Sequence, residues 1–296
     1  MADAKSGEDT ACRQPRVAMV IGAGSVKCAA ALGARRVLEE AGIQVDLVVG
    51  CSGGTLFAAT IACGMSVEEA TDHTVNLWTR AMMEQKNRRA LLQTMFPKLM
   101  KFGPQWGMRK TKMMEENMQA VFEGQRLEET DIPLFFTATD FWTGEQVVLS
   151  DGPIAEAARA SSAIPFVFPP VEIDGRLLLD GFLSDPLPVG VAIQEGADII
   201  IALGFESPYQ QSVTSAGRFA RQMTAIMTNN LLNARYAFQS LAHHSEVVPI
   251  VPVFEKRVGT FSTEMIPYCI EKGEEATRAE LPHILRNIEI LGEGGV

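Results

Sequence analysis

The sequence predicts an α/β fold in three layers, a mainly parallel β-sheet flanked by helices. Short, almost continuously apolar runs at residues 17–22, 45–50 and 199–204 are typical of strands that are buried on both faces. Helical patterns such as residues 29–41 separate these runs, and this alternation is expected of parallel strands joined by crossover helices. With 296 residues, of which 47% are hydrophobic, the chain can bury one large core.

Local signals place the individual elements. The helix at residues 29–41 is expected to stop at Gly42, because glycine readily adopts the backbone conformation that ends helices. A helix rich in small residues follows the second strand, at residues 54–63, and Ser66 before two glutamates is typical of a capped helix start. The remaining strands are expected at residues 134–139, 146–150, 177–179, 199–204 and 247–254, and the remaining helices at residues 154–160, 216–241 and 271–291.

The composition argues against several classes of function. A formal net charge of −10 does not suit a general nucleic-acid-binding protein. The five cysteines show no paired spacing, which is usual in a reducing compartment, and neither they nor the four histidines have the spacing of metal ligands. We therefore expect no metal site, no cofactor and no nucleic-acid partner.

Residues 1–15 are polar and lack the apolar core of a signal peptide, so we interpret them as a disordered lead. Residues 16–296 are expected to form a single domain, with residues 80–124 inserted as a cap or lid. No apolar run reaches the length that spans a membrane, and we expect a cytoplasmic protein. The sequence makes no prediction of oligomeric state.

The most informative motif is Gly50-Cys51-Ser52-Gly53-Gly54, directly after the second predicted strand. Small residues around a serine allow the backbone a strained turn between strand and helix, which exposes the hydroxyl. Gly50 and Gly54 are the flanking glycines of this elbow. Glycine-rich turns between strand and helix also occur in α/β proteins without any such chemistry, so the motif alone is a weak signal.

Two further features strengthen it. A glycine-containing turn at residues 22–28 follows the first strand, and an apolar strand ends in Asp180-Gly181 before a proline-rich turn that extends to residue 188. These three pieces, in this order, resemble the patatin-like phospholipase family, whose pattern is a glycine-rich loop, then Gly-x-Ser-x-Gly, then Asp-Gly-Gly/Ala. The similarity extends to residues 35–43, 138–145 and 158–170 and covers roughly residues 16–204.

The resemblance implies a lysophospholipase-type fold and hydrolysis of lipid acyl esters, of the phospholipase A or lysophospholipase type. It implies Ser52 as nucleophile and Asp180 as general base, working through an acyl-enzyme without a histidine. A carboxylate can serve directly as base if it lies within hydrogen-bond reach of the hydroxyl. Without the resemblance, Asp180 could equally be an ordinary turn aspartate before glycine.

In this family the first turn supplies backbone amides for the oxyanion. Here the pattern is altered, because only Gly24 and the basic Lys27 match it in one register, and a register shifted by one keeps Gly22 and Gly24. The candidate amides are those of Gly22, Gly24, Ser25 and Val26. Lys27 either supports the loop by pairing with a carboxylate or is a solvated lysine. Cys28 replaces a glycine of the family, which puts the geometry of the loop in question.

The segment 80–112 is unusually basic and rich in methionine. Its charged residues are Arg80, Lys86, Arg88, Arg89, Lys98, Lys101, Arg109, Lys110 and Lys112, against the single acid Glu84. Basic groups among apolar side chains suit the inner, anionic surface of a membrane, where the protein would bind peripherally. The alternative is a cap of helices whose apolar face joins the core. Prolines and glycines divide the segment into short helices, as expected of a mobile lid.

Two other functions stay open. The first is an α/β-hydrolase with a Ser-Asp-His triad, in which His243, His244 or His283 would follow Asp180 in the chain order of that fold. The elbow of that fold normally follows several strands, whereas here it follows one. The second is a catalytically weakened patatin-like protein that binds lipid or a membrane without turnover, which the altered loop at residues 22–28 suggests.

Overall fold

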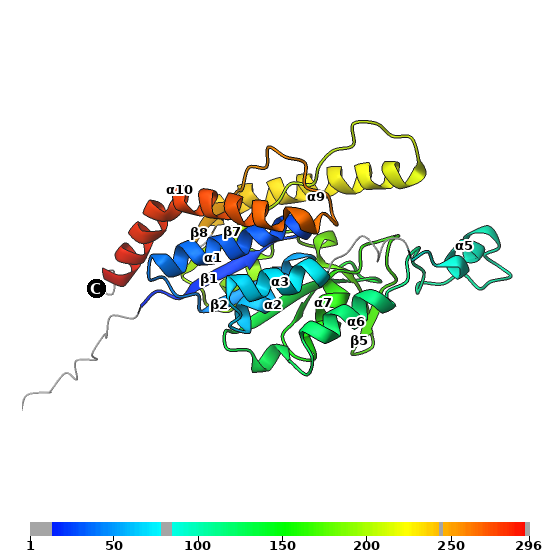
Figure 1. Cartoon of the computed structure of the whole chain (residues 1–296), viewed down its shortest axis with the longest axis horizontal. Coiled ribbons are helices and arrows are strands. Elements are labelled where there is room, and N and C mark those ends of the chain that lie inside the picture. Colours follow the sequence, from blue (N-terminus) through cyan, green and yellow to red (C-terminus); the bar gives the residue numbers. More distant parts are fainter. Residues whose placement is uncertain (1–13, 78–84, 243–244, 294–296) are drawn as a thin grey trace, which may run out of the picture.

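The computed structural model describes residues 14–77, 85–242 and 245–293, so most of the predicted disordered lead lies outside the described residues (Figure 1). The chain forms an eight-stranded sheet of order β5-β6-β3-β2-β1-β7-β8, with β4 beside β3. The strands are β1 Val17–Ile21, β2 Leu47–Cys51, β3 Leu134–Asp140, β4 Gln146–Leu149, β5 Val171–Ile173, β6 Arg176–Asp180, β7 Ile199–Leu203 and β8 Glu246–Ile250.

The sheet is mainly parallel where its strands are most buried. β1 pairs in parallel with both β2 and β7, and β3 and β8 extend the parallel part on either side. Pairing becomes antiparallel beyond β3, where β4, β6 and β5 follow. The predicted fold class is confirmed.

Helices cover both faces of this sheet (Figure 1). They are α1 Ala30–Glu40, α2 Gly54–Ala62, α3 Val67–Leu77, α5 Arg88–Met95, α6 Lys112–Val121, α7 Ile154–Ser161, α8 Val189–Gln194, α9 Ala216–Ala242 and α10 Ile266–Glu293. Side chains alternate between the two faces along each strand. Met19 accordingly packs in the larger core with α1, α2 and α10, whereas Val20 packs with α8 and with Leu232 of α9. The result is the predicted arrangement of three layers.

The largest differences from the predicted boundaries are at β8 and α10. β8 ends at Ile250 rather than residue 254, because its neighbour β7 ends at Leu203, which pairs with Ile250. A strand at the edge of a sheet has no other partner to extend it. α10 begins at Ile266, five residues before its predicted start, and continues through Pro282. The predicted cap of α3 is present, since Ser66 and Glu69 exchange side-chain and backbone hydrogen bonds of 2.9 and 3.2 Å.

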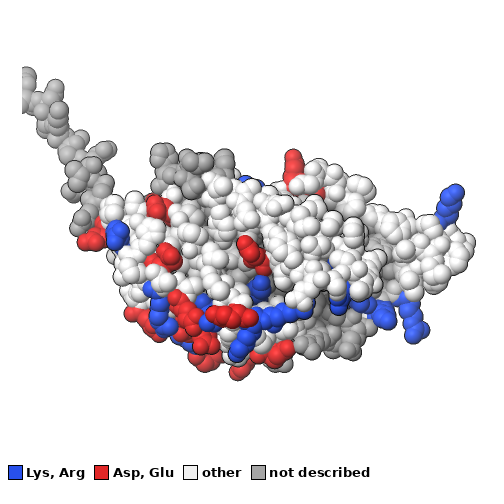
Figure 2. Space-filling view, turned by 90° about the horizontal axis from the view of Figure 1, so that it is seen from above, with Lys and Arg blue, Asp and Glu red and all other residues white. Residues whose placement is uncertain are grey.

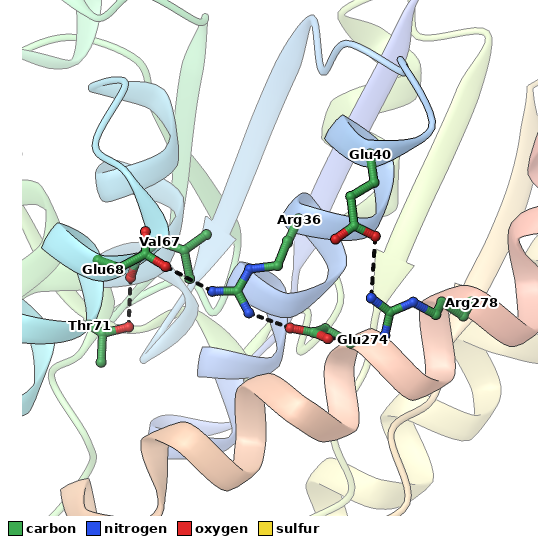
Figure 3. Close-up of polar contacts among 7 residues, drawn as sticks. All are labelled: Arg36, Glu40, Val67, Glu68, Thr71, Glu274 and Arg278. Carbon is green, nitrogen blue, oxygen red and sulfur yellow. Dashed lines mark hydrogen bonds and ion pairs between the residues drawn. The ribbon is translucent and has the colours of Figure 1, made fainter.

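Ion pairs brace the outer helices α1, α3 and α10 (Figure 3). Arg36 of α1 pairs with Glu68 of α3 at 3.1 Å and also with Glu274 of α10. Arg278 of α10 pairs with Glu40 at 3.3 Å and with Glu274 at 3.0 Å. A hollow of about 500 Å³ lies beside Arg36, between these helices. Because both guanidinium groups already pair with carboxylates, we interpret the cluster as a brace between helices.

The described part of the predicted cap contains short helices, as expected from its prolines and glycines. α5 is followed by turns over residues 96–111, and α6 then leads back to the α/β core. Met108 N–H donates to the Phe166 carbonyl at 3.2 Å, and Arg109 N–H to the Val167 carbonyl at 2.9 Å, which anchors the cap near the end of α7. α5 projects from the rest of the molecule (Figure 1). Arg80 and Glu84, at the start of the predicted cap, lie outside the described residues.

Candidate active site

The turn after β2 holds Ser52 in a strained conformation. Its φ is +54°, in the left-handed region that residues other than glycine rarely adopt. The flanking glycines permit the turn: a Cβ at Gly50 would lie 2.8 Å from Thr55 Cα, and one at Gly54 would lie 2.4 Å from the Ile21 carbonyl oxygen. The predicted elbow is therefore present, and larger residues at these two positions would prevent the turn.

Asp180, at the end of β6, meets Ser52 across the sheet. The Ser52 hydroxyl donates to Asp180 Oδ2 at 2.8 Å, and the other carboxylate oxygen accepts the Phe182 N–H at 3.2 Å. β3 makes this possible, since its Thr137 pairs with Cys51 and the next residue, Ala138, pairs with Asp180. Two residues 128 positions apart in sequence thus share a hydrogen bond.

Burial changes the acidity of this carboxyl group. Asp180 has no exposed surface, and Ser52 is only 8% exposed. Loss of solvation raises the pKa of Asp180 to about 7, although the hydrogen bonds from Ser52 and from the Phe182 amide lower it in part. Within the described part of the chain, Asp180 has no ion pair with a basic side chain. A group with this pKa can exchange a proton near neutral pH, as a general base requires.

This pKa predicts a pH profile for ester hydrolysis. The rate is expected to rise with pH through about 7 and to level off above it, because only ionised Asp180 can take the Ser52 proton. The measurement is kcat/KM for a soluble ester between pH 5 and 9, with stability checked at each pH. A flat profile over this range would contradict the role of Asp180.

The loop after β1 differs in part from its prediction. Gly22 N–H donates to the Leu203 carbonyl at 2.9 Å, so it is not available to an oxyanion, and this part of the prediction is wrong. Its amide is held by β7 because residue 22 still continues the parallel pairing. The next residues start a 3-10 helix at Ser25–Ala29, where helix-start amides lack partners within the helix. Among the described residues, the N–H groups of Gly24, Ser25 and Val26 have no acceptor.

The loop lies directly against the elbow. A Cβ at Gly53 would come within 2.5 Å of Ser25 Cα, and Ser25 itself has a φ of +54°. The Ser25 hydroxyl is tied to the Thr260 carbonyl. Glycine at position 53 therefore allows the backbone of the loop to approach the residue that follows Ser52. The predicted amides of Gly24, Ser25 and Val26 lie on the loop that contacts this elbow.

Replacing Gly53 by alanine is expected to lower ester hydrolysis by about 100-fold, the size of effect seen when one oxyanion donor is lost. The added Cβ would meet backbone atoms of Ser25, which cannot move without displacing the loop. Gly190→Ala on α8 is the matched control, since nothing lies within 4 Å of a Cβ there. Measured with a soluble ester, an unchanged kcat in a folded Gly53→Ala protein would contradict the role of the loop.

Lys27 and Cys28 both hold the loop, in ways that the sequence did not indicate. Lys27 Nζ donates to the Glu206 backbone carbonyl at 2.9 Å, rather than to a carboxylate, and lies over the Phe254 ring. Burial lowers the pKa of Lys27. The Cys28 thiol donates to the Gly22 carbonyl at 3.3 Å, so this cysteine closes the turn where the family has glycine.

Three supporting residues were missed by sequence reasoning. Ser161 Oγ accepts the Ser52 N–H at 2.9 Å and donates to a carbonyl of β3, and Ser162 Oγ donates to the Ser52 carbonyl at 3.2 Å. Adjacent serines at the end of a predicted helix were the available signal. Arg235 of α9 pairs with the buried Asp185 at 3.3 Å, in the turn that follows Asp180. No local signal marks Arg235, because its partner is distant in sequence.

A narrow crevice opens beside the loop and the elbow. Its walls are Ser25, Val26, Gly53, Leu56, Phe57, Thr74, Thr263 and Ile266. It leads between α2 and the start of α10, and its lining includes Gly53 but not Ser52. A lining with this many apolar side chains suits an apolar group of a ligand.

The histidines that the structure describes lie away from Ser52. His283 of α10 is within 3.6 Å of Glu246, at the start of β8, whereas Ser52 follows the end of the parallel strand β2. His73 is exposed on α3. His243 and His244 lie outside the described residues. Over residues 14–77, 85–242 and 245–293, no group of three or more His, Cys, Asp or Glu side chains is arranged to hold a metal ion.

The family model described as "Patatin-like phospholipase" matches residues 19–193, which include the loop, the elbow and Asp180. The chain belongs to the patatin-like phospholipase family. An NTE family protein of Mycobacterium tuberculosis is 32% identical over 189 residues, which is 64% of this chain and 49% of that protein. Human patatin-like phospholipase domain-containing protein 6 is 28% identical over 203 residues, 68% of this chain and 14% of that protein.

This patatin-like protein therefore spans about half the length of the mycobacterial relative that it matches. Solved structures were also compared with it. Human GIVD cytosolic phospholipase A2 aligns with a TM-score of 0.49 and 11% identity, covering 100% of this chain and 61% of that one. VipD from Legionella pneumophila aligns with a TM-score of 0.47 and 15% identity, covering 92% and 67%.

Proposed function

We propose that the protein is a serine esterase that hydrolyses acyl ester bonds of lipids, of the phospholipase A or lysophospholipase type. The observation that carries the proposal is the 2.8 Å hydrogen bond from the Ser52 hydroxyl to the fully buried Asp180 carboxylate. A strained serine beside a carboxylate whose pKa is about 7 has the features of an activated nucleophile and its base. Membership of the family supports a lipid ester as substrate.

The reaction would proceed in two halves. Ser52 Oγ attacks the ester carbonyl while its proton passes to Asp180, and the amides of Gly24, Ser25 and Val26 are the proposed donors to the oxyanion. Collapse of this intermediate breaks the bond to the leaving alcohol, which takes the proton from Asp180. Water then attacks the acyl-enzyme and gives a proton to Asp180. Asp180 returns this proton to Ser52 Oγ as the bond to the acyl group breaks, so the fatty acid leaves with Ser52 and ionised Asp180 restored.

The crevice beside the loop is the proposed start of the acyl site. Leu56, Phe57 and Ile266 would contact the apolar chain of the substrate, while the carbonyl group lies at Ser52. Because the space is narrow, a long chain would require these side chains or the cap to move. We therefore expect faster turnover of short-chain than of long-chain esters when the substrate is monomeric.

The basic cap is proposed to contact an anionic membrane surface. Its described basic residues Lys86, Arg88, Arg89, Lys98, Lys101 and Lys110 are exposed. Exposed apolar side chains stand among them, namely Leu91, Leu92, Met95, Phe96, Leu99 and Phe102. Each basic group near such a surface contributes about 1 kcal/mol to binding. The alternative cap prediction, with its apolar face in the core, fits α6, whose Met114 and Met118 are buried in the core, but not α5 and the turns that follow it.

No described helix has both the length and the apolar character needed to cross a bilayer.

The test is release of fatty acid from phosphatidylcholine, from lysophosphatidylcholine and from short-chain p-nitrophenyl esters, with a chelator present. We expect turnover of at least one lipid ester, with no loss on chelation. Vesicle binding without turnover of any ester would instead favour the catalytically weakened, lipid-binding protein. A requirement for a metal ion would contradict the proposed mechanism.

A further inference from the structure

The first turns of α9 carry apolar side chains on the face that is exposed to solvent, where a surface helix usually carries polar side chains. Residues that recur every three or four positions share one face of a helix. The exposed side chains of this stripe are Phe219, Met223, Ile226 and Met227. Phe219 is 56% exposed and Met227 is 68% exposed. The opposite face, with Ala225 and Leu232, is the one that is buried.

We call these four residues the α9 ridge. A contiguous exposed apolar stripe is unusual on a soluble protein and marks a contact with another molecule. The ridge is confined to the N-terminal part of the helix, since the exposed residues further along include Asn230, Asn233 and Ala234. Nothing in the core therefore requires apolar side chains at these positions.

Charge indicates the kind of partner. Residues 207–242 contain no aspartate or glutamate, and Arg218 and Arg221 are exposed on the same turns of α9 as the ridge. Residues 85–114, which form most of the cap, also contain no acidic residue. Both segments are thus purely basic within a chain of net charge −10. Figure 2 shows Lys and Arg side chains at the cap end, whereas most of the acidic side chains in view gather on the other half of the molecule.

The two basic segments project on the same side. In Figure 1, α5 and the first turns of α9 both extend beyond the sheet at the right, where the parallel strands end. Ser52 lies at this edge, directly after the last residue of β2. A flat surface that touched both segments would therefore face the edge of the sheet that carries the candidate active site.

We propose that the α9 ridge inserts into the interface of an anionic lipid bilayer, and that the ridge and the cap together orient Ser52 toward the membrane. This inference rests on the proposed lipid-ester substrate and adds a second contact site, on a different element from the cap. Anionic lipid suits the ridge better than a second copy of this chain would, because a symmetric dimer would place ridge against ridge and bring their positive charges together.

The test compares Met223→Glu/Met227→Glu with a matched control, Leu285→Glu/Ile290→Glu on α10. The control residues are 44% and 57% exposed and lie toward the end of the helix that runs away from the cap (Figure 1). Binding to vesicles of phosphatidylcholine with phosphatidylglycerol is measured by co-sedimentation. We expect the ridge variant to bind at least tenfold more weakly than the parent and the control to bind like the parent.

Hydrolysis of a soluble short-chain ester separates this inference from the proposed function. The ridge variant is expected to keep the parent rate on that ester, since the ridge is not in the catalytic site. A parent that binds vesicles but hydrolyses no ester would overturn the proposed function alone. Equal vesicle binding by the ridge variant and the parent, both folded by circular dichroism, would overturn the α9 contact. So would a dimeric parent that the ridge variant converts to monomer.

Discussion

Replacing Ser52 by alanine is expected to lower ester hydrolysis by about 10⁴-fold or more, because no other group in the site can form the acyl-enzyme. The fold should persist. Alanine meets the same backbone strain as serine at a φ of +54°, and the hydroxyl removed makes one hydrogen bond, to Asp180. Without that donor Asp180 remains protonated over a wider pH range, which a buried carboxyl group tolerates.

A fluorophosphonate probe tests this prediction without knowledge of the substrate. We expect the probe to modify Ser52 in the parent, with the site mapped by mass spectrometry, and not to react with Ser52→Ala. Ser245→Ala is a matched control. Ser245 directly precedes β8, and its hydroxyl also makes one hydrogen bond, to the Ala197 carbonyl. Labelling that persisted in Ser52→Ala, or that mapped to Cys51, would refute Ser52 as the nucleophile.

The second large effect is expected for Asp180→Asn, which should lower kcat by about 10³- to 10⁴-fold. Asparagine keeps the shape of the side chain but cannot accept the Ser52 proton. The hydrogen bond would also reverse, since the amide donates to the hydroxyl oxygen. Reactivity of Ser52 toward the fluorophosphonate probe should fall with the rate of hydrolysis.

The same variant is expected to be more stable than the parent above pH 7. The pKa of Asp180 is about 7 in the folded protein and about 4 in an unfolded chain, so folding favours the protonated form. Its contribution to stability is therefore complete below pH 4 and is lost as the pH rises through 7. Asparagine carries no such penalty, and the gain at pH 8 should be on the order of 4 kcal/mol.

Thermal unfolding at pH 4 and pH 8 measures this difference. Asp174→Asn is the matched control, since Asp174 is exposed in the turn between β5 and β6, with a φ of +51° that asparagine adopts readily. It should alter neither the rate nor the pH dependence of stability. A loss of stability in Asp180→Asn that is equal at both pH values would argue against a buried, ionising carboxylate.

Much of the candidate site follows from short-range sequence patterns. Gly50 and Gly54 mark the elbow because only small residues fit a turn in which the neighbouring backbone is within 3 Å of the added Cβ. The strand that ends at Asp180 could be placed for a similar reason, since a buried strand is an apolar run and the polar residue after it marks its end. Boundaries such as the end of β8 depend instead on the length of a neighbouring strand, which the local sequence does not contain.

The sequence by itself determined the fold class and the elbow at Ser52, because local chain conformation and burial leave patterns in the chain, whereas Asp180 as the expected partner of Ser52 followed from the resemblance to the family. Tertiary structure alone decided which backbone amides of the loop after β1 are free to bind an oxyanion. The Gly22 amide is taken by β7, whereas those of Gly24, Ser25 and Val26 have no acceptor among the described residues. It also decided the partners of Lys27 and Asp185 and the exposure of the α9 ridge. These features depend on contacts between segments far apart in sequence, and no local pattern records such contacts.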